Sequence, residues 1–488
     1  MKKILNAPER VVTEMCHGLV LSQPSLRWDP QYQIISRKTP AVDKVCLISG
    51  GGSGHEPTHA GFVGRGMLDA AVCGDVFASP SQIQVYHAIR KVASPKGVLL
   101  VVKNYSGDIM NFKNAAYLAS EDGIAVDYVK VDDDIAVQDS LYTVGRRGVA
   151  GTLFVHKLAG AAAERGDSLA EVKAVAEKTV SRLKSIGFAF SSCTVPSKGS
   201  PTFEIADDEM EYGVGIHGEP GIRREKTCTA DELAKRMVDA LVKELALTDK
   251  PGEELALLVN GLGGTPGMEL NILNLAVRRE LERFGLKVDF SLVGNFMTSI
   301  DMQGASVTLL HLDEELKALL HAPCNTPAWK LDGEETAAAW FEPAQADAAA
   351  GPVSYGIETD AAWEKTDDHS LSLHNIIYLV DAMSDCIIRN EVPFCELDSH
   401  AGDGDFGMSV AKGFRCLKEQ WKQIIGNAAT IGDFLGQSAM VIMEHCGGAS
   451  GPIWGSACRG AARSAGAKTS LNTQEIAQML QSSRPAAP

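Results

Sequence analysis

Continuous apolar runs, each followed by a glycine-rich or polar segment, recur along the first two-thirds of the chain. They lie at 45–49, 70–74, 98–102 and 255–260 and have the length of buried strands. Helical patterns separate them, so that predicted strands and helices alternate. This order predicts an α/β layer fold.

The α/β region is predicted to consist of two successive halves, at about 1–185 and 186–330. A Ser-x-x-Glu capping box at Ser168 opens a helix that the pattern continues to about Gly187, where strand character returns. Another helix is expected to begin near Pro57, because proline suits the first turn of a helix. Together, the halves form one predicted α/β domain over 1–330.

The last third of the chain has a different pattern. An Ala-rich, Pro-containing stretch of weak periodicity leads us to interpret 331–365 as an interdomain linker. Beyond it, apolar residues recur at helical spacing, which predicts an all-helical domain over 366–488. Its first helix is expected to break at Pro393 and to be followed by an acidic loop at 397–405.

Composition narrows the class of protein. The net charge of −16 argues against a nucleic-acid binder, which would carry a basic surface, but allows small neutral substrates and metal-bound nucleotides. The 11 cysteines are scattered and include no C-x-x-C pair, which favours reduced thiols. The N-terminus lacks the apolar core of a signal peptide, and no apolar run is long enough for a membrane span. We therefore expect a cytoplasmic protein with no nucleic-acid or membrane partner.

Three histidines, His55, His59 and His217, lie in glycine-rich loops. Glycine allows backbone N–H groups to approach a ligand closely, although glycines alone are equally compatible with a tight strand-to-helix turn. A single histidine is more often structural than catalytic. Three of them in loops that offer little core to join favour a functional site.

Asp398, Asp403 and Asp405 are spaced so that their carboxylates can fold around one hard cation, such as Mg²⁺ bridging nucleotide phosphates. The spacing is not that of an EF-hand, and a solvated acidic turn is the alternative. The glycine-rich stretch 446–452 opens another predicted helix, whose N-terminus suits a phosphate. It is not a Walker A loop, because the Gly-Lys-Ser/Thr element is missing.

Five motifs resemble the substrate-binding part of dihydroxyacetone (glycerone) kinases. They are GGGSGHEPTHAG at 50–61, AVCGDVFASPS at 71–81, VKNYSGDIMNF at 102–112, GIHGEPG at 215–221 and NGLGGTPGMEL at 260–270. The resemblance implies that His217 adds to the substrate ketone to form a covalent hemiaminal. It also implies that His55 and Asp108 form an acid/base pair for the terminal hydroxyl of the substrate. The positions that line the substrate correspond to Gly52, Ser79 and Lys103.

Two further motifs, LDSHAGDGDFG at 397–407 and GGASGP at 447–452, resemble the metal and phosphate loops of the family's nucleotide domain, a helical barrel. The resemblance implies that ATP and Mg²⁺ are bound there. It assigns the metal to Asp398, Asp403 and Asp405. It assigns the nucleotide to Gly447, Gly448, Ser450 and Gly451.

In the family that this sequence resembles, the helical domain has more helices than this sequence predicts. We therefore expect an all-α domain that is incomplete at its C-terminus, with a tail at 482–488 that is disordered or the product of an altered reading frame. Missing helices supplied by another chain are a variant of this hypothesis.

The function expected from this resemblance is ATP-dependent phosphorylation of dihydroxyacetone to dihydroxyacetone phosphate. One alternative is a kinase of another short ketose such as erythrulose, since a covalent anchor recognises only the carbonyl. The other is a ketone-binding or regulatory protein whose nucleotide domain no longer supports turnover. The resemblance also implies a homodimer formed through the α/β domain.

Overall fold

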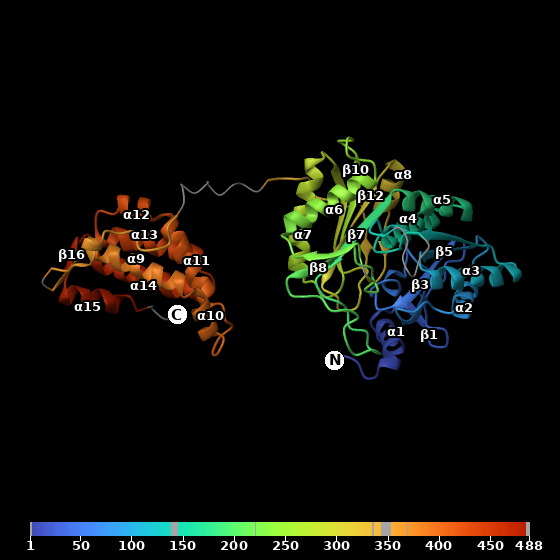
Figure 1. Cartoon of the computed structure of the whole chain (residues 1–488), viewed down its shortest axis with the longest axis horizontal. Helices are drawn as coiled ribbons and strands as arrows, with labels where there is room; N and C mark the ends of the chain where they lie inside the picture. The colour runs from blue at the N-terminus through green and yellow to red at the C-terminus, as the bar shows by residue number, and fades with distance from the viewer. Residues whose placement is uncertain are drawn as a thin grey trace. The chain divides into compact units, whose positions relative to one another are not determined.

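The computed structural model describes residues 2–137, 145–219, 221–333, 336–342, 353–367 and 369–484. The chain divides into two compact units, Met1–Phe341 and Glu342–Pro488, so the division falls within the predicted linker (Figure 1). Parts of that linker, 334–335 and 343–352, lie outside the described residues, as does the end of the predicted tail, 485–488. The exact domain boundaries stay predictions.

The first half of the α/β unit is built on one sheet with the strand order β1-β2-β4-β3-β5-β6. The neighbours β4, β3, β5 and β6 are parallel, while β1 and β2 are antiparallel. The strands are β1 (Leu26–Asp29), β2 (Ile34–Arg37), β3 (Cys46–Ser53), β4 (Ala70–Val76), β5 (Val98–Lys103) and β6 (Val126–Val131). Because β3 and β5 are buried on both faces, they read as continuous apolar runs in the sequence.

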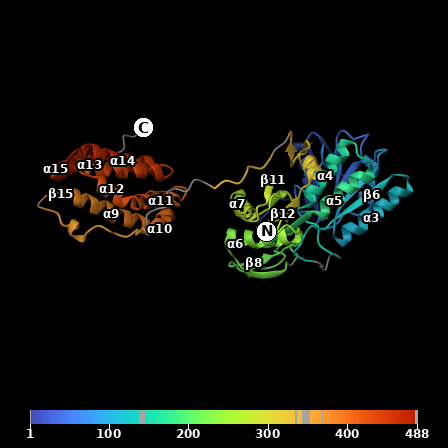
Figure 2. The ribbon, with the colours of Figure 1, turned by 90° about the horizontal axis from the view of Figure 1, so that it is seen from above.

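Helices cover both faces of this sheet (Figures 1 and 2). Ile48 and Leu100 pack with α2 and α3, whereas the alternate residues Leu47 and Leu99 belong to a core shared with α4 and α5. The helices are α1 (Val11–Ser22), α2 (Gln82–Val92), α3 (Ser106–Glu121), α4 (Thr152–Arg165) and α5 (Leu169–Ser181), and a short 3-10 turn, η2 (Ala60–Phe62), follows β3.

The second half has the strand order β11-β10-β12-β7-β8-β9, with β10 and β11 parallel and the other pairs antiparallel. Its strands are β7 (Leu183–Ala189), β8 (Glu209–Tyr212), β9 (Arg223–Lys226), β10 (Glu254–Gly261), β11 (Lys287–Gly294) and β12 (Gly304–His311). Its helices are α6 (Ala230–Glu244), α7 (Gly267–Arg283) and α8 (Glu314–His321). Leu258 joins the core of the first sheet, while Leu257 packs with α6 and α7. One hydrophobic core therefore connects the two halves.

Two local predictions in this unit are wrong. No helix begins at Pro57; the chain makes turns there and then forms η2. The helix opened by Ser168 ends at Ser181 rather than near Gly187, because the residues from Leu183 pair with β12 as strand β7. The capping box at Ser168 is confirmed.

The second unit is helical and packs around its own core. Its helices are α9 (Leu373–Arg389), α10 (Glu391–Asp398), α11 (Phe406–Glu419), α12 (Trp421–Asn427), α13 (Ile431–His445), α14 (Ser450–Ala465) and α15 (Thr473–Ser482). A short antiparallel pair joins β15 (Ser370–Ser372) to β16 (Ser470–Asn472). The prediction that a helix breaks at Pro393 and gives way to a loop is wrong. Pro393 lies in the first turn of α10, where its missing N–H has no helical partner to lose.

None of the helices in the described ranges is long and apolar enough to cross a membrane. The expected cytoplasmic location stays a prediction.

Candidate active site

A cavity of about 1100 Å³ opens in the α/β unit. The first sheet contributes residues at the carboxyl ends of β3, β4 and β5, which is where parallel α/β sheets place ligands. The second sheet contributes the loop between β8 and β9. The cavity is lined by Gly52, Phe77, Ser79, Tyr105, Ser106, Gly107, Asp108, Lys198, Thr202, Phe203, Glu211, His217, Gly218, Glu219 and Arg224.

His55 and His217 meet at this cavity, with their Nε2 atoms 3.1 Å apart. The Nδ1 atom of His55 lies 2.8 Å from the carbonyl oxygen of Thr298, which can only accept, so this nitrogen carries a proton. The Nδ1 atom of His217 lies 2.9 Å from a carboxylate oxygen of Glu219 and is therefore also a donor. Because both rings donate through Nδ1, the two Nε2 atoms form a hydrogen bond only when one additional proton is shared between them.

Burial lowers the pKa of His55 well below its ordinary value, and the facing His217 lowers it further. The ring is fully enclosed and stacks on Phe77, with ring centroids 5.2 Å apart. A proton on this histidine is therefore held weakly and is readily given to a better acceptor.

Glu219 holds the other histidine. Its two oxygens accept the ring Nδ1–H and the backbone N–H of His217, each at 2.9 Å. Burial alone would raise the pKa of Glu219, but His217 and Arg147 outweigh it and lower that pKa to about 2. Arg147 is itself fully buried and donates to Asp134 at 2.7 Å. Glu219 is thus an ionised carboxylate that fixes the ring orientation of His217.

Asp108 lies in the first turn of α3 and lines the same cavity. Ser79 donates to its Oδ1, and the ammonium of Lys103 lies 3.6 Å from its Oδ2. Lys103, at the end of β5, is fully buried behind the cavity wall, and burial lowers its pKa. The carboxylate therefore keeps a hydroxyl donor on one oxygen and a cation beside the other.

The structure brings together every residue that the sequence suggested for the ketone site. His217, Asp108, Ser79 and Gly52 line the cavity, and His55 and Lys103 contact that lining. The roles assigned to them stay predictions. Sequence reasoning missed Glu219, although it follows His217 in the same motif, and the aromatic wall formed by Phe77 and Tyr105.

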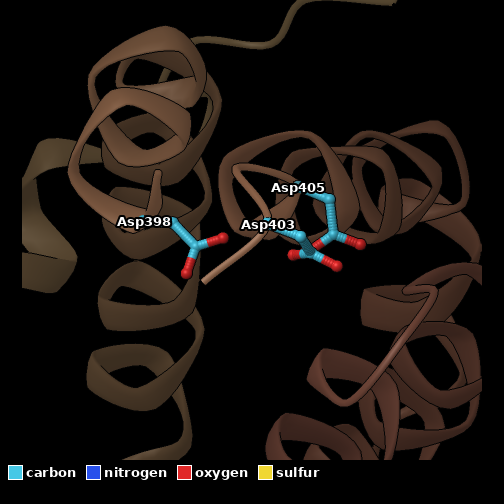
Figure 3. Close-up of side chains that lie close together, drawn as sticks. All are labelled: Asp398, Asp403 and Asp405. Atoms are coloured by element: carbon cyan, nitrogen blue, oxygen red, sulfur yellow. The ribbon is translucent and has the colours of Figure 1, made fainter. Parts of the chain in front are cut away.

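The second unit holds the three predicted metal ligands. Asp398 ends α10, and Asp403 and Asp405 precede α11, as Figure 3 shows. One carboxylate oxygen from each lies within 4.8 Å of the others. The carboxylate of Asp403, and more weakly that of Asp398, raises the pKa of Asp405. Mutual repulsion among exposed carboxylates is what a divalent cation with oxygen ligands would relieve, so the donor set fits Mg²⁺.

The predicted phosphate loop lies beside these aspartates. The hydroxyl of Ser409 in α11 donates to the carbonyl of Gly447 at 2.7 Å, and Ser450 begins α14. A Cβ added to Gly448 would lie 3.6 Å from Asp405. A Cβ on Gly451 would lie only 2.4 Å from the carbonyl oxygen of Cys446. Gly448 thus places the backbone beside Asp405, and Gly451 lets the first turn of α14 approach Cys446 at the end of α13.

Comparison with known proteins defines the class. The Dak1 domain model matches residues 17–328, and the DAK2 domain model matches residues 400–487. The chain belongs to the dihydroxyacetone kinase family, as an α/β Dak1 domain followed by a helical DAK2 domain.

Individual relatives agree with this assignment. The dihydroxyacetone-binding subunit DhaK of the PTS-dependent dihydroxyacetone kinase 1 of Listeria innocua is 51% identical over 331 residues, which cover 67% of this chain and all of that protein. Human triokinase/FMN cyclase is 36% identical over 479 residues, 96% of this chain and 81% of that protein. The dihydroxyacetone kinase of C. freundii, solved with AMP-PNP and Mg²⁺, superposes with a TM-score of 0.67 at 32% identity, covering 98% of this chain and 86% of that one. The prediction of an incomplete helical domain finds no support in these matches.

Proposed function

We propose that the chain phosphorylates dihydroxyacetone with ATP and holds the substrate as a hemiaminal on His217. The observation that carries this proposal is the convergence of His217, His55 and Asp108 on one cavity. The kinases among the relatives support the general class of phosphotransferase. The substrate and the residue roles are our inference.

The tautomers described above suggest how the adduct forms. With the shared proton on His55, the Nε2 atom of His217 has a free lone pair and attacks the ketone carbon. His55 then donates its Nε2 proton to the former carbonyl oxygen, so the new C–N bond and the new hydroxyl form without any other reactant. The low pKa of His55 favours this transfer. Only a carbonyl compound can be held in this way, so glycerol is rejected.

Asp108 is the proposed base for the terminal hydroxyl of the bound substrate. Its Oδ1 is engaged by Ser79 and its Oδ2 faces Lys103, an arrangement that holds the carboxylate at the cavity wall. In the helical unit, Asp398, Asp403 and Asp405 would hold Mg²⁺, and the segment from Gly447 to Gly451 would bind the nucleotide phosphates. The ion would neutralise charge on the transferring phosphoryl group.

The test combines adduct detection with turnover. We expect purified protein incubated with dihydroxyacetone to gain the mass of one substrate molecule, and Mg·ATP to yield dihydroxyacetone phosphate in a coupled assay. His217→Ala should lose both, whereas His17→Ala, on the exposed face of α1, should lose neither. An adduct that persists in His217→Ala would overturn the assignment. An adduct without turnover in the unmodified protein would favour the ketone-binding alternative.

A kinase of a longer ketose is the second candidate, because the cavity of about 1100 Å³ has room beyond a three-carbon substrate. Comparing kcat/KM for erythrulose and dihydroxyacetone distinguishes the two. The homodimer stays a prediction.

A further inference from the structure

His59 is a buried histidine that the proposed reaction leaves without a role. It directly precedes η2, and only 5% of the residue is exposed. Its Nδ1 lies 3.1 Å from the hydroxyl of Ser49, and its Nε2 lies 2.9 Å from the ammonium of Lys103. The ring therefore bridges β3 and β5 directly behind the cavity wall.

The hydrogen bonds of Ser49 fix the tautomer of this ring. The single hydroxyl proton of Ser49 is donated to the carbonyl oxygen of Val101 at 2.7 Å, so the hydroxyl can only accept from His59. His59 is therefore protonated on Nδ1. Burial, and then the nearby Lys103, lowers the pKa of His59 well below its ordinary value, so the ring is neutral and its Nε2 is a pure acceptor.

The groups around Lys103 show what the Nε2 atom of His59 does. The ammonium is fully buried and faces His59 and Asp108; His156 of α4 and His55 lie farther away. At 3.6 Å, Asp108 is beyond hydrogen-bond length, so His59 supplies the short contact. Gly51 makes room for this arrangement, because an added Cβ there would lie 2.4 Å from the ammonium nitrogen.

We propose that His59 is a positioning residue, whose neutral Nε2 holds the Lys103 ammonium beside Asp108 and so presets the charge at the base of the ketone site. This inference rests on the proposed function for its catalytic consequence, but the His59–Lys103 contact itself does not. Ser49 contributes to this positioning, because its hydrogen bond keeps the proton of His59 on Nδ1 and leaves Nε2 as an acceptor.

Two amide variants separate the functions of the two ring nitrogens. In His59→Asn, the side-chain amide can still donate to Ser49 but is too short to reach Lys103. In His59→Gln, the longer side chain can place its carbonyl oxygen where Nε2 was. His156→Phe is the matched control, since it changes a neighbouring buried ring, 5.3 Å from His59 between centroids. Among the residues that the structure describes, neither ring nitrogen of His156 has a hydrogen-bond partner.

The primary readout is the pKa of Lys103, measured by NMR on protein labelled with ¹³C at the lysine ε-carbon. The Lys103 signal is assigned by its loss in Lys103→Met. Losing the acceptor destabilises the charged ammonium, so His59→Asn should lower this pKa by about 1 pH unit. Ser49→Ala should lower it less, because the ring then becomes free to change tautomer. His59→Gln should restore it, and His156→Phe should leave it unchanged. An unchanged pKa in His59→Asn overturns the proposal.

The second readout is the pH profile of kcat/KM for dihydroxyacetone. Its alkaline limb should move to lower pH in His59→Asn and return in His59→Gln, which a merely structural defect would not do. If the unmodified protein shows no turnover while the Lys103 pKa still shifts as expected, the proposed function fails and the role of His59 stands. If turnover is present but the alkaline limb does not respond to His59→Asn, the inference fails and the proposed function stands.

Discussion

Glu219 accepts two hydrogen bonds from His217, one from the ring Nδ1 and one from the backbone N–H, with one carboxylate oxygen for each. This double contact aligns the ring and leaves Nε2 as the nitrogen available for the proposed attack on the ketone. Because the carboxylate is buried and ionised, the contact also couples the site to the stability of the α/β unit.

Glu219→Gln should therefore lower kcat/KM by about 100-fold, since the neutral amide orients His217 poorly. Stability should also change with pH. The folded-state pKa of Glu219 is depressed from 4.5 to about 2, so its contribution is complete above about pH 4.5 and is lost as the pH falls toward 2. We therefore expect Glu219→Gln to lower the free energy of unfolding at pH 7 by about 3 kcal/mol.

Urea unfolding of both proteins at pH 7 and at decreasing pH measures this difference, which should shrink toward pH 2. Glu269→Gln, on the exposed face of α7, is the matched control and should change neither quantity. A stability difference that does not depend on pH would contradict the account.

Gly51→Ala tests the space behind the cavity. The new Cβ would lie 2.4 Å from the Lys103 nitrogen and 3.5 Å from Asp108, so the flexible ammonium must move. The φ of 158° at Gly51 adds local backbone strain to this displacement. We expect a folded protein whose kcat/KM for dihydroxyacetone falls by about tenfold or more. Gly18→Ala in α1 is the control, because its added Cβ would have no described atom within 4 Å apart from its chain neighbours and the backbone of its own helix. Equal kinetics for the two variants would show that the position of Lys103 does not matter.

Asp405→Asn tests the metal site. Removing one of three converging carboxylates should weaken Mg²⁺ binding by about tenfold or more, as measured by Mn²⁺ titration followed by electron paramagnetic resonance. In the unmodified protein, Asp403 raises the pKa of Asp405, so binding should weaken as the pH falls through that raised value. This pH dependence should be reduced in Asp405→Asn. Unchanged affinity in the variant would mean that the aspartates form only a solvated turn.

A buried ion pair supports the helical unit away from that site. Asp381 of α9 accepts from Lys418 of α11 and from the backbone N–H groups of Glu358 and Thr359, and both charged side chains are fully buried. Asp381→Asn leaves the ammonium without its charge partner and should cost about 3–5 kcal/mol. Calorimetric unfolding should show the transition of this unit at a lower temperature, with no change in the α/β unit. Glu444→Gln, at an exposed position, is the control.

Much of the proposed ketone site could be predicted from the pattern of strands. In a parallel sheet, the carboxyl ends of β3, β4 and β5 share one edge, so the residues that follow them meet there. Glu219 could not be found in this way, because its contact with His217 depends on how the loop turns between them. Gly218 adopts a φ of 75°, which folds the chain back and returns the carboxylate to the preceding ring.

The wrong boundaries have similar physical causes. Local sequence allows the helix after Ser168 to continue, but the pairing of Leu183 to Ala189 with β12 offers ladder hydrogen bonds and burial that outweigh helix propensity. Near Pro393, a proline that would interrupt a helix interior is tolerated because a new helix begins two residues earlier. Both outcomes depend on tertiary partners or on a cap position that residue spacing does not specify.

If the glycine loop at 447–451 binds the nucleotide phosphates as proposed, its closeness to Asp398, Asp403 and Asp405 should favour one nucleotide species over another. Gly448 brings the backbone to Asp405, so a polyphosphate entering this loop also approaches three carboxylates. Free ATP would meet like charge, whereas the magnesium complex brings the neutralising ion with it. The helical unit should thus discriminate against uncomplexed nucleotide, and ATP in excess of magnesium should be a poor competitor for the site.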